Sequence, residues 1–362
     1  MSSLRNRETL FVLNSAVVLI SLIVLVFLEI PSLNHDLEIK FFFDTETYLK
    51  RAELFSKLDK FNIYVLYEMA VTNKFGPVLL GYLSNNNYYL IWIFNMIIYI
   101  VSSNYIIKSL HLNPAIYHTI SLLNCITWIS LVSLNKEIFV FPSIAALLYY
   151  LDKKSIISFL LLIGFCFLVR WQMALFAIVV AFAFSKFMIF KDKRLLHVLG
   201  LLFLISIYLP IFTEDLRYSI EFWTAQAMDR SGGGSGLYQV WINWDMNFLY
   251  FISFIFKLIH LTILNFISFL GNPSVVLTRF HNFAETLQSG VFLACYMMIY
   301  RRRRKLSLNN DLVYLIFFYF IIFVAVQIYT PRYLYAGYLL ITILLSSDLK
   351  TKFNNPKTIS IA

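Results

Sequence analysis

The stretch Tyr88–Ile107, YYLIWIFNMIIYIVSSNYII, decides the fold class because none of its 20 residues is charged. An α-helix of about 20 apolar residues, rising ~1.5 Å per residue, spans the ~30 Å hydrocarbon core of a bilayer. Phe11–Ile30, in which Glu29 is the one charged residue, and Leu195–Phe212, which has none, are further apolar stretches of about this length. The sequence therefore predicts an all-α, polytopic membrane protein.

Composition supports this prediction. The chain has 362 residues, of which 60% are hydrophobic and 14% are charged. Soluble domains average roughly 45–50% apolar and about 25% charged residues, so a soluble globular protein is excluded. Ten spans of about 20 residues would use some 200 residues, which leaves only loops and no room for a separate soluble catalytic domain.

The hydrophobic blocks predict about ten transmembrane helices in one integral-membrane domain, residues 1–362. Two longer outer loops are expected, at about 31–85 and 213–246. The predicted spans are 9–30, 86–107, 114–134, 138–151, 155–169, 172–190, 195–212, 283–300, 311–329 and 334–347.

The basic residues set the expected orientation. A net charge of +10 and the run Arg301–Lys305 would also suit nucleic acid, but Lys and Arg gather in the cytoplasmic loops of membrane proteins. With the N-terminus inside, most basic residues fall in short cytoplasmic segments. This predicts cytoplasmic termini and no nucleic-acid partner.

The apolar stretch 246–270 does not fit as an eleventh crossing, because it would move Arg301–Lys305 to the outside. A re-entrant or interfacial helix pair, broken near Lys257–His260 and ending at Gly271–Pro273, preserves the orientation. Irregular helices of this kind are tolerated where protein covers them or they line a cavity.

Charged residues at the outer ends of helices are the candidates for function. Glu137 is 15 residues before Asp152, and Arg170 and Arg332 are each 16 residues from an inner-side charge. These separations correspond to about 22–24 Å of helix, which places all three roughly 6–8 Å below the outer surface of a ~30 Å core. Charges at that depth are costly unless they are paired or lie in a water-filled recess. We therefore expect a shared recess that opens outward.

The residue types in this recess suggest a chemistry. Arginine binds phosphate or diphosphate through forked hydrogen bonds, and a nearby carboxylate can accept a proton from a hydroxyl nucleophile. These features fit a lipid-phosphate-linked sugar with its tail in the bilayer. His281 and Glu285, four residues apart, have the spacing of a metal pair but also of an ordinary polar helix end. No metal or other cofactor is expected.

The order of the motifs resembles that in bacterial oligosaccharide repeat-unit polymerases of O-antigen and capsule assembly, the Wzy and EpsG-like families. The resemblance rests on an Asp-Thr-X-X-Tyr segment, a Lys-Glu pair, an Arg at a helix end and an Arg-Tyr before the last helix. The matching residues are Asp44, Thr45, Tyr48, Lys136, Glu137, Arg170, Arg332 and Tyr333. The chain also resembles the wider GT-C membrane glycosyltransferases, which have an acidic pair in the first outer loop, here Asp44 and Glu46.

The resemblance implies an enzyme of the bacterial inner membrane that polymerises undecaprenyl-diphosphate-linked repeat units, with a chain-length regulator as a further candidate partner. Asp44, Glu46 and Glu137 are the candidate catalytic carboxylates. The candidate substrate-binding residues are Arg170, Arg332, Lys136, Tyr48, Gln172, Tyr333, Arg217, Arg279 and His281. Two alternatives remain open at this point: a GT-C enzyme that adds a single sugar from a polyprenyl monophosphate, and a lipid-linked oligosaccharide flippase.

Overall fold

The computed structural model describes residues 2–27, 45–56, 63–185, 193–212, 235–264, 266–267, 270, 280–325 and 331–347. Within these ranges every regular element is a helix, as predicted. The elements are α1 (Ser2–Phe27), α2 (Thr45–Ser56), α3 (Ile63–Val71), α4 (Phe75–Leu83), α5 (Tyr88–Ser109), α6 (Pro114–Leu123), α7 (Cys125–Val132), η1 (Lys136–Phe139), α8 (Val140–Lys153), α9 (Ile156–Val169), α10 (Trp171–Ala183), α11 (Arg194–Phe212), α13 (Ser235–Met246), α14 (Tyr250–Ile259), η2 (His260–Leu264), α17 (Phe280–Arg301), η3 (Arg303–Lys305), α18 (Asp311–Ala325), η4 (Pro331–Leu334) and α19 (Tyr335–Ser346).

Three of the described helical segments are long and apolar enough to cross a membrane: Glu8–Phe27, Tyr88–Ser109 and Arg194–Ile211. The bent pair α6–α7 makes a fourth if it is counted as one span. These helices indicate a membrane protein. Each of the other predicted spans also contains a helix, but the apolar helices among them are shorter than a bilayer core, with 12 to 15 residues in α8, α9, α10, α18 and α19.

The predicted span 114–134 is wrong as a single straight helix, because α6 and α7 meet at a bend of 86°. Asn124 causes the break by adopting an extended backbone and capping α7, where its side chain accepts a hydrogen bond from the Ile126 amide. The carbonyls that the break exposes are bonded by Thr127 Oγ1 and Trp128 Nε1, at 2.6 and 2.7 Å. Side-chain hydrogen bonds to the Ser121 and Leu122 carbonyls therefore stabilise the bend.

A helix pair does occur in this part of the chain, but it is formed by α13 and α14 and so begins before residue 246. Antiparallel α13 and α14 form a hairpin whose reversal is at residues 247–249, where Phe248 has a positive φ of 62°. No break occurs near Lys257–His260; instead α14 continues into the π-helical turn η2. A buried ion pair between Asp245 and Lys257 joins the two arms, and this pairing explains how an apolar segment retains a lysine.

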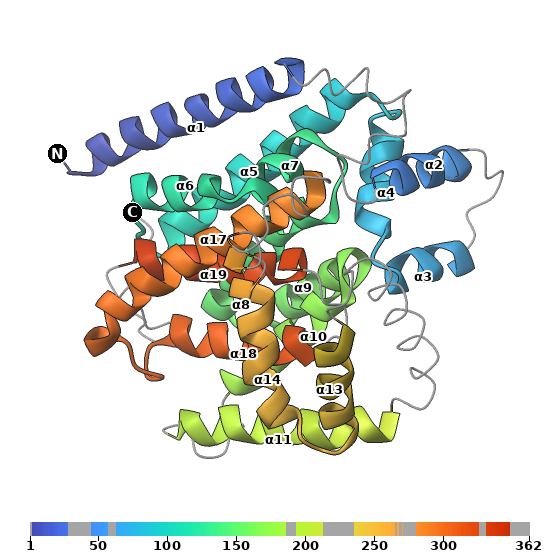
Figure 1. Ribbon diagram of the computed structural model, residues 1–362. Coiled ribbons are helices and arrows are strands. Elements are labelled where there is room, and N and C mark those ends of the chain that lie inside the picture. Colours follow the sequence, from blue (N-terminus) through green and yellow to red (C-terminus); the bar gives the residue numbers. More distant parts are fainter. Residues whose placement is uncertain are drawn as a thin grey trace.

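The first predicted outer loop, 31–85, is largely helical where the structure describes it. Helices α2, α3 and α4 lie together at one side of the molecule (Figure 1). The Thr45 hydroxyl donates to the Leu134 carbonyl at 3.0 Å, and Asn73 accepts from the Trp171 amide at 3.0 Å. These bonds attach α2 and the end of α3 to the segments that carry Lys136 and Arg170.

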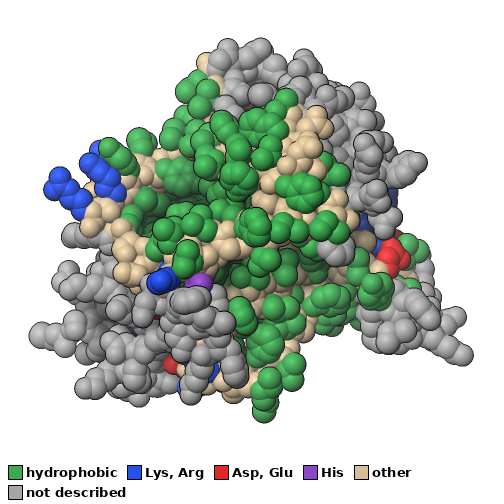
Figure 2. All heavy atoms as spheres, turned by 90° about the horizontal axis from the view of Figure 1, so that it is seen from below, with side chains coloured by type: hydrophobic (Ala, Val, Ile, Leu, Met, Phe, Trp, Pro, Cys, Tyr) green, Lys and Arg blue, Asp and Glu red, His purple; other side chains and the backbone are tan. Residues whose placement is uncertain are grey.

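The core lies around α18 and α19. Every residue of α19 is buried, and α1, α6, α11, α18 and α19 run roughly along one direction, with α13 and α14 across them (Figure 1). Gly337 permits the close approach of α18 and α19, since a Cβ at this position would lie 2.8 Å from ring atoms of both Tyr319 and Phe320. The face seen in Figure 2 is largely hydrophobic over the described residues.

The start of α1 and the end of α19 lie on the same side of the molecule (Figure 1). Basic residues gather at helix ends on this side. Arg302 donates to the Leu345 carbonyl at 2.9 Å, and Arg194 donates to the Leu308 carbonyl at 3.0 Å. Lys136 precedes α8, Arg170 follows α9 and Arg332 precedes α19. These helix ends lie away from the basic side, so the two sets of cations are at opposite ends of the bundle.

Candidate functional site

Charged side chains from four separate parts of the chain converge around Tyr333. They come from η1, the junction of α9 and α10, the first turns of α17, and η4. We call this group the Tyr333 cluster, and its members are Lys136, Glu137, Arg170, Glu285, Arg332 and Tyr333. The structure thus brings together the Lys-Glu, Arg and Arg-Tyr motifs that the sequence predicted to share one depth.

Three cations surround the Tyr333 ring. Lys136 Nζ lies 4.8 Å from the ring centroid, and Cζ of Arg170 and Arg332 lie at 5.1 and 5.5 Å. Lys136 Nζ is also 3.5 Å from the Tyr333 hydroxyl. Such cation–π contacts hold each cation against a ring face, so one aromatic ring organises three positive charges that would otherwise repel one another.

The Tyr333 backbone is also held in place, by hydrogen bonds to its carbonyl. Its carbonyl accepts hydrogen bonds from Arg170 Nη2 at 3.3 Å and from the Tyr319 hydroxyl at 2.8 Å. Arg170 also packs over the Phe323 ring, 5.3 Å from its centroid. Because Tyr319 and Phe323 belong to α18, the cluster is anchored to the most buried part of the bundle.

Two carboxylates accompany the cations. Glu285 interacts electrostatically with both Arg332 and Glu137, and Tyr319 with both Arg170 and Glu137. Within the described residues, however, no oxygen of Glu137 or Glu285 forms an ion pair shorter than 4.0 Å. Three cations against two carboxylates give the cluster a formal charge of +1, which favours an anionic ligand.

Glu137 and Arg170 have unused hydrogen-bonding capacity. Both carboxylate oxygens of Glu137, and Nε and Nη1 of Arg170, are buried and form no hydrogen bond in the described structure. The Glu137 residue is 0% exposed and Arg170 is 2% exposed. A buried charge without partners costs several kcal/mol, and native proteins rarely retain one without a reason outside folding. The arrangement is therefore typical of a ligand site.

Local sequence explains how these side chains reach a common depth. Asn135 caps η1 through its side chain, so Lys136 and Glu137 begin a helical turn instead of a loop. Arg170 has an extended backbone between α9 and α10 and cannot cap α10, a role that Asn73 takes instead. Helices α8 and α9, of 14 residues, are about 21 Å long, so their ends stop short of a ~30 Å membrane core.

Two members of the cluster are deeply buried among the described residues. The Glu137 residue is 0% exposed and Arg170 is 2% exposed. A separate hollow lies near the opposite end of α17, lined by Tyr296, Met297, Tyr300 and Arg301. The expected outward opening of the recess remains a prediction.

Other candidate residues have different positions. Tyr48 is 1% exposed in α2, and Gln172 is 6% exposed at the start of α10 with an unbonded Oε1. Glu46 lies in α2 and His281 in α17, but their side chains lie outside the described structure. Asp44, Arg217 and Arg279 also lie outside the described residues.

Glu285 was missed as a site residue, having been considered only with His281, as a metal pair or as an ordinary polar helix end. The signal that could have revealed it is the polar face of α17, on which Glu285, Gln288 and Ser289 recur at helical spacing in an apolar segment. No group of three His, Cys, Asp or Glu side chains that could hold a metal occurs in the described part of the chain.

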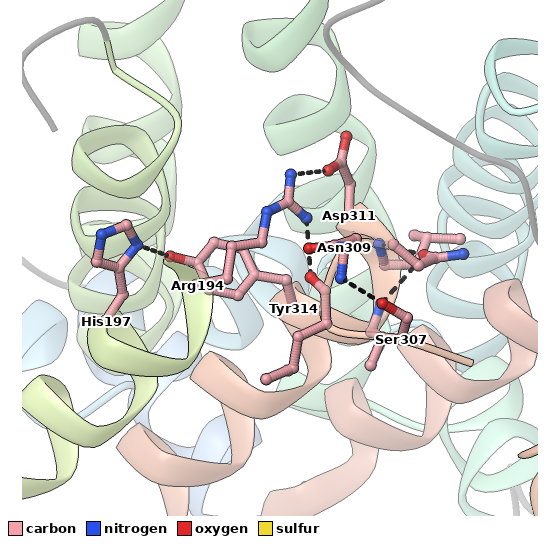
Figure 3. A network of polar contacts seen from close by, with 10 residues as sticks. Arg194, His197, Ser307, Asn309, Asp311 and Tyr314 are labelled. Atoms are coloured by element: carbon pink, nitrogen blue, oxygen red, sulfur yellow. Dashed lines mark hydrogen bonds and ion pairs between the residues drawn. The ribbon is translucent and has the colours of Figure 1, made fainter. Parts of the chain in front are cut away.

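A second polar network, on the basic side, has ordinary pairing. Arg194 forms an ion pair of 2.5 Å with Asp311, and its other terminal nitrogen donates to the Leu308 carbonyl (Figure 3). His197 bonds the Tyr314 hydroxyl at 2.7 Å. Every charged group drawn in this network has a partner, in contrast to Glu137.

Comparison with known proteins adds no assignment. The chain matches no protein-family model, no curated protein and no solved structure at a significant level.

Proposed function

We propose that the protein is an integral-membrane glycosyltransferase that polymerises undecaprenyl-diphosphate-linked oligosaccharide repeat units into O-antigen or capsular polysaccharide. The observation that carries this proposal is the convergence of Lys136, Arg170 and Arg332 on Tyr333, with donor groups of Arg170 buried and unused. A diphosphate is the ligand class that matches several forked cationic donors at the end of an apolar helix bundle.

The cations would act on the leaving group. As the bond between the donor sugar and its lipid diphosphate breaks, negative charge grows on the diphosphate. Arginine donors fixed in a site of low dielectric stabilise such charge without reorganising. Arg170 is held in this way by the Tyr333 carbonyl and by two aromatic rings, which leaves Nε and Nη1 for phosphate oxygens.

A carboxylate would receive the proton from the acceptor. The hydroxyl oxygen of one repeat unit attacks the anomeric carbon of the other, the carbon–oxygen bond to the diphosphate breaks, and the hydroxyl proton moves to a carboxylate base. The sequence nominates Asp44, Glu46 and Glu137 for this role. Of these, only Glu137 has a described side chain, and it belongs to the cluster.

The arrangement of charges supports a site at the outer face of the bacterial inner membrane. The basic helix ends at Arg194 and Arg302 lie at the opposite end of the bundle from the cluster. If the positive-inside rule orients the chain, the cluster faces outward. The proposal includes about ten crossings, both termini in the cytoplasm, and a chain-length regulator as a partner.

The test is deletion of the gene, followed by gel electrophoresis of the surface polysaccharide. Loss of long chains with accumulation of a single-repeat product supports a polymerase. Chains of normal length that lack one branch sugar would replace the proposal with a GT-C enzyme using a polyprenyl monophosphate. Loss of all surface glycan, with lipid-linked intermediates trapped inside, would instead identify a flippase.

Complementation then tests the site. Arg170→Ala and Arg332→Ala are expected to lower chain elongation about 100- to 1000-fold, the loss typical for removal of a transition-state donor. Glu68→Gln is the control. Glu68 forms an exposed ion pair with Arg51, unlike the buried charges of the cluster, and loss of this pair should leave elongation unchanged. Elongation that survives both alanine variants would overturn the site assignment.

A further inference from the structure

The first turns of α17 carry a polar face that the proposed function does not use. Glu285 is 9% exposed, and Gln288 and Ser289 are 0% exposed. Phe292, two turns after Glu285, contacts the Tyr338 ring of α19 at 5.4 Å between centroids. Residues 285, 288, 289 and 292 share a helix face, so this face is directed toward α19 and the preceding turn η4, which carries Arg332 and Tyr333.

Ser289 differs from most serines in the bundle. A serine in an apolar helix usually returns its hydroxyl to the carbonyl four residues earlier, and several here do so: Ser130, Ser133, Ser143, Ser206 and Ser346. The buried Ser289 hydroxyl makes no hydrogen bond in the described structure. It therefore presents a donor and an acceptor one turn beyond Glu285.

Two further neutral groups with unused capacity adjoin the charged motifs in the chain. Asn135, next to Lys136, has an unbonded Nδ2, and Gln172, two residues after Arg170, has an unbonded Oε1. The acceptor Gln172 Oε1 is informative, because a diphosphate offers only acceptors and cannot satisfy it. A ligand with hydroxyl groups, which donate and accept, satisfies an amide oxygen, an amide nitrogen and a serine together.

The two carboxylates of the cluster are not equally accessible. The Glu137 residue is 0% exposed, and both of its carboxylate oxygens are buried without a hydrogen bond. Glu285 is 9% exposed, and neither of its oxygens is in that condition. Glu285 also lies in the field of Arg332. A base that must touch the hydroxyl of an incoming sugar needs a reachable oxygen, which favours Glu285 over Glu137.

We propose that the polar face of α17 is the acceptor-sugar subsite, in which Ser289 binds a hydroxyl of the acceptor and Glu285 is the catalytic base. This inference rests on the proposed function. The attacking hydroxyl forms the new bond to the anomeric carbon and gives its proton to the Glu285 carboxylate. The diphosphate leaves with the bonding electron pair and later takes up that proton. Glu137 then serves to balance the charge of the arginines.

The experiment separates binding of the leaving group from elongation. Full-length variants are purified in detergent and titrated with unglycosylated undecaprenyl diphosphate, while the same variants complement the deletion strain. Glu285→Gln is expected to bind this probe within about 3-fold of wild type and to lose elongation at least about 100-fold, the usual contribution of a general base. Glu285→Asp, which keeps the charge, should restore part of the elongation.

Ser289→Ala is expected to lower elongation about 10-fold, the cost of roughly one hydrogen bond, without changing binding of the probe. The matched control is Ser206→Ala in α11, whose buried hydroxyl bonds the Leu202 carbonyl, and it should elongate normally. Normal elongation by Ser289→Ala would remove Ser289 from the subsite.

The opposite outcomes are distinct. Normal elongation by Glu285→Gln, or a loss of probe binding that parallels the loss of elongation, would overturn the assignment of Glu285 as base. If Glu285→Gln does not accumulate in the membrane, Glu285→Asp decides, since unimpaired elongation by that shorter side chain contradicts a positioned base. A deletion strain with normal polysaccharide would refute the proposed function itself, whatever the variants do.

Discussion

The two ends of α18 carry charged networks that differ in how they are completed. At the start of the helix, Asp311 is 1% exposed and pairs with Arg194, which also bonds a carbonyl (Figure 3). Near its other end, Phe323 contacts Arg170, whose Nε and Nη1 remain unused beside an unbonded Glu137. Similar residues therefore form a closed ion pair at one end and an open set of charges at the other.

The two networks differ in how completely their charged groups are hydrogen-bonded. A buried ion pair with complete hydrogen bonding is compatible with a role in holding helices together, and the Asp245–Lys257 pair of the α13–α14 hairpin is another example. Buried polar atoms without a hydrogen bond, such as both Glu137 oxygens, lower the free energy of unfolding and call for an explanation outside the fold. Matched substitutions at the two ends should therefore separate stability from activity.

The largest expected effect on stability is at the closed end. Arg194→Met leaves the Asp311 carboxylate buried without its cation, and should lower the free energy of unfolding by about 3–5 kcal/mol. Thermal unfolding of the detergent-solubilised protein measures this loss. The double variant Arg194→Met, Asp311→Asn should recover part of it, and a single variant as stable as wild type would contradict the comparison.

The same substitution at the open end should have the opposite profile. Arg170→Met removes a buried guanidinium that makes one hydrogen bond in the described structure and leaves two donors unused, so the free energy of unfolding should fall by only about 1 kcal/mol, less than for Arg194→Met. Elongation should nevertheless fall at least about 100-fold. A fall in unfolding temperature as large as that of Arg194→Met would show that Arg170 is a structural residue.

A smaller effect is expected from the ring between the cations. Tyr333→Leu removes the contacts of the ring with Lys136, Arg170 and Arg332, and should weaken binding of undecaprenyl diphosphate about 10-fold because the cations lose their fixed positions. Tyr333→Phe keeps the ring and should bind within about 2-fold of wild type. Equal losses in the two variants would assign the effect to the hydroxyl instead.

The smallest effect is expected at the exposed Arg51–Glu68 pair, where the side chains are 32% and 61% exposed. Glu68→Gln should change the unfolding free energy by less than about 1 kcal/mol, because solvent screens such pairs. Unfolding temperatures measured at low and high salt test this. A change comparable to that of Arg194→Met would mean that outer-helix contacts matter more than the bundle.

The sequence predicted the helical class and most helix positions, since apolar blocks are a strong and local signal. It also predicted which charges would meet, because the distance from an inner-side charge to Glu137, Arg170 or Arg332 can be counted along a helix. The bend at Asn124 was not predicted, since an asparagine inside an apolar block does not reveal whether its side chain will cap a new helix. The helix pair was expected to break near Lys257–His260, whereas the chain reverses at residues 247–249 and Lys257 forms a buried ion pair with Asp245.

The burial of the cluster and the place of Glu285 in it depend on packing and could not be counted along the chain. From α18, the Tyr319 hydroxyl donates to the Tyr333 carbonyl and the Phe323 ring packs against Arg170. Glu285 interacts electrostatically with Arg332 because α17 packs on η4, a contact between segments about 47 residues apart that no local pattern encodes.

Gly337 connects the apolar core to this site. A Cβ atom added to Gly337 would lie 2.8 Å from ring atoms of Tyr319 and Phe320. Gly337 is only four residues after Tyr333. Even a single added methyl group must push the start of α19 away from α18, and Arg332 and Tyr333 move with it. A screen for loss-of-function alleles would therefore find positions that carry no charge and touch no substrate, and Gly337 should be prominent among them.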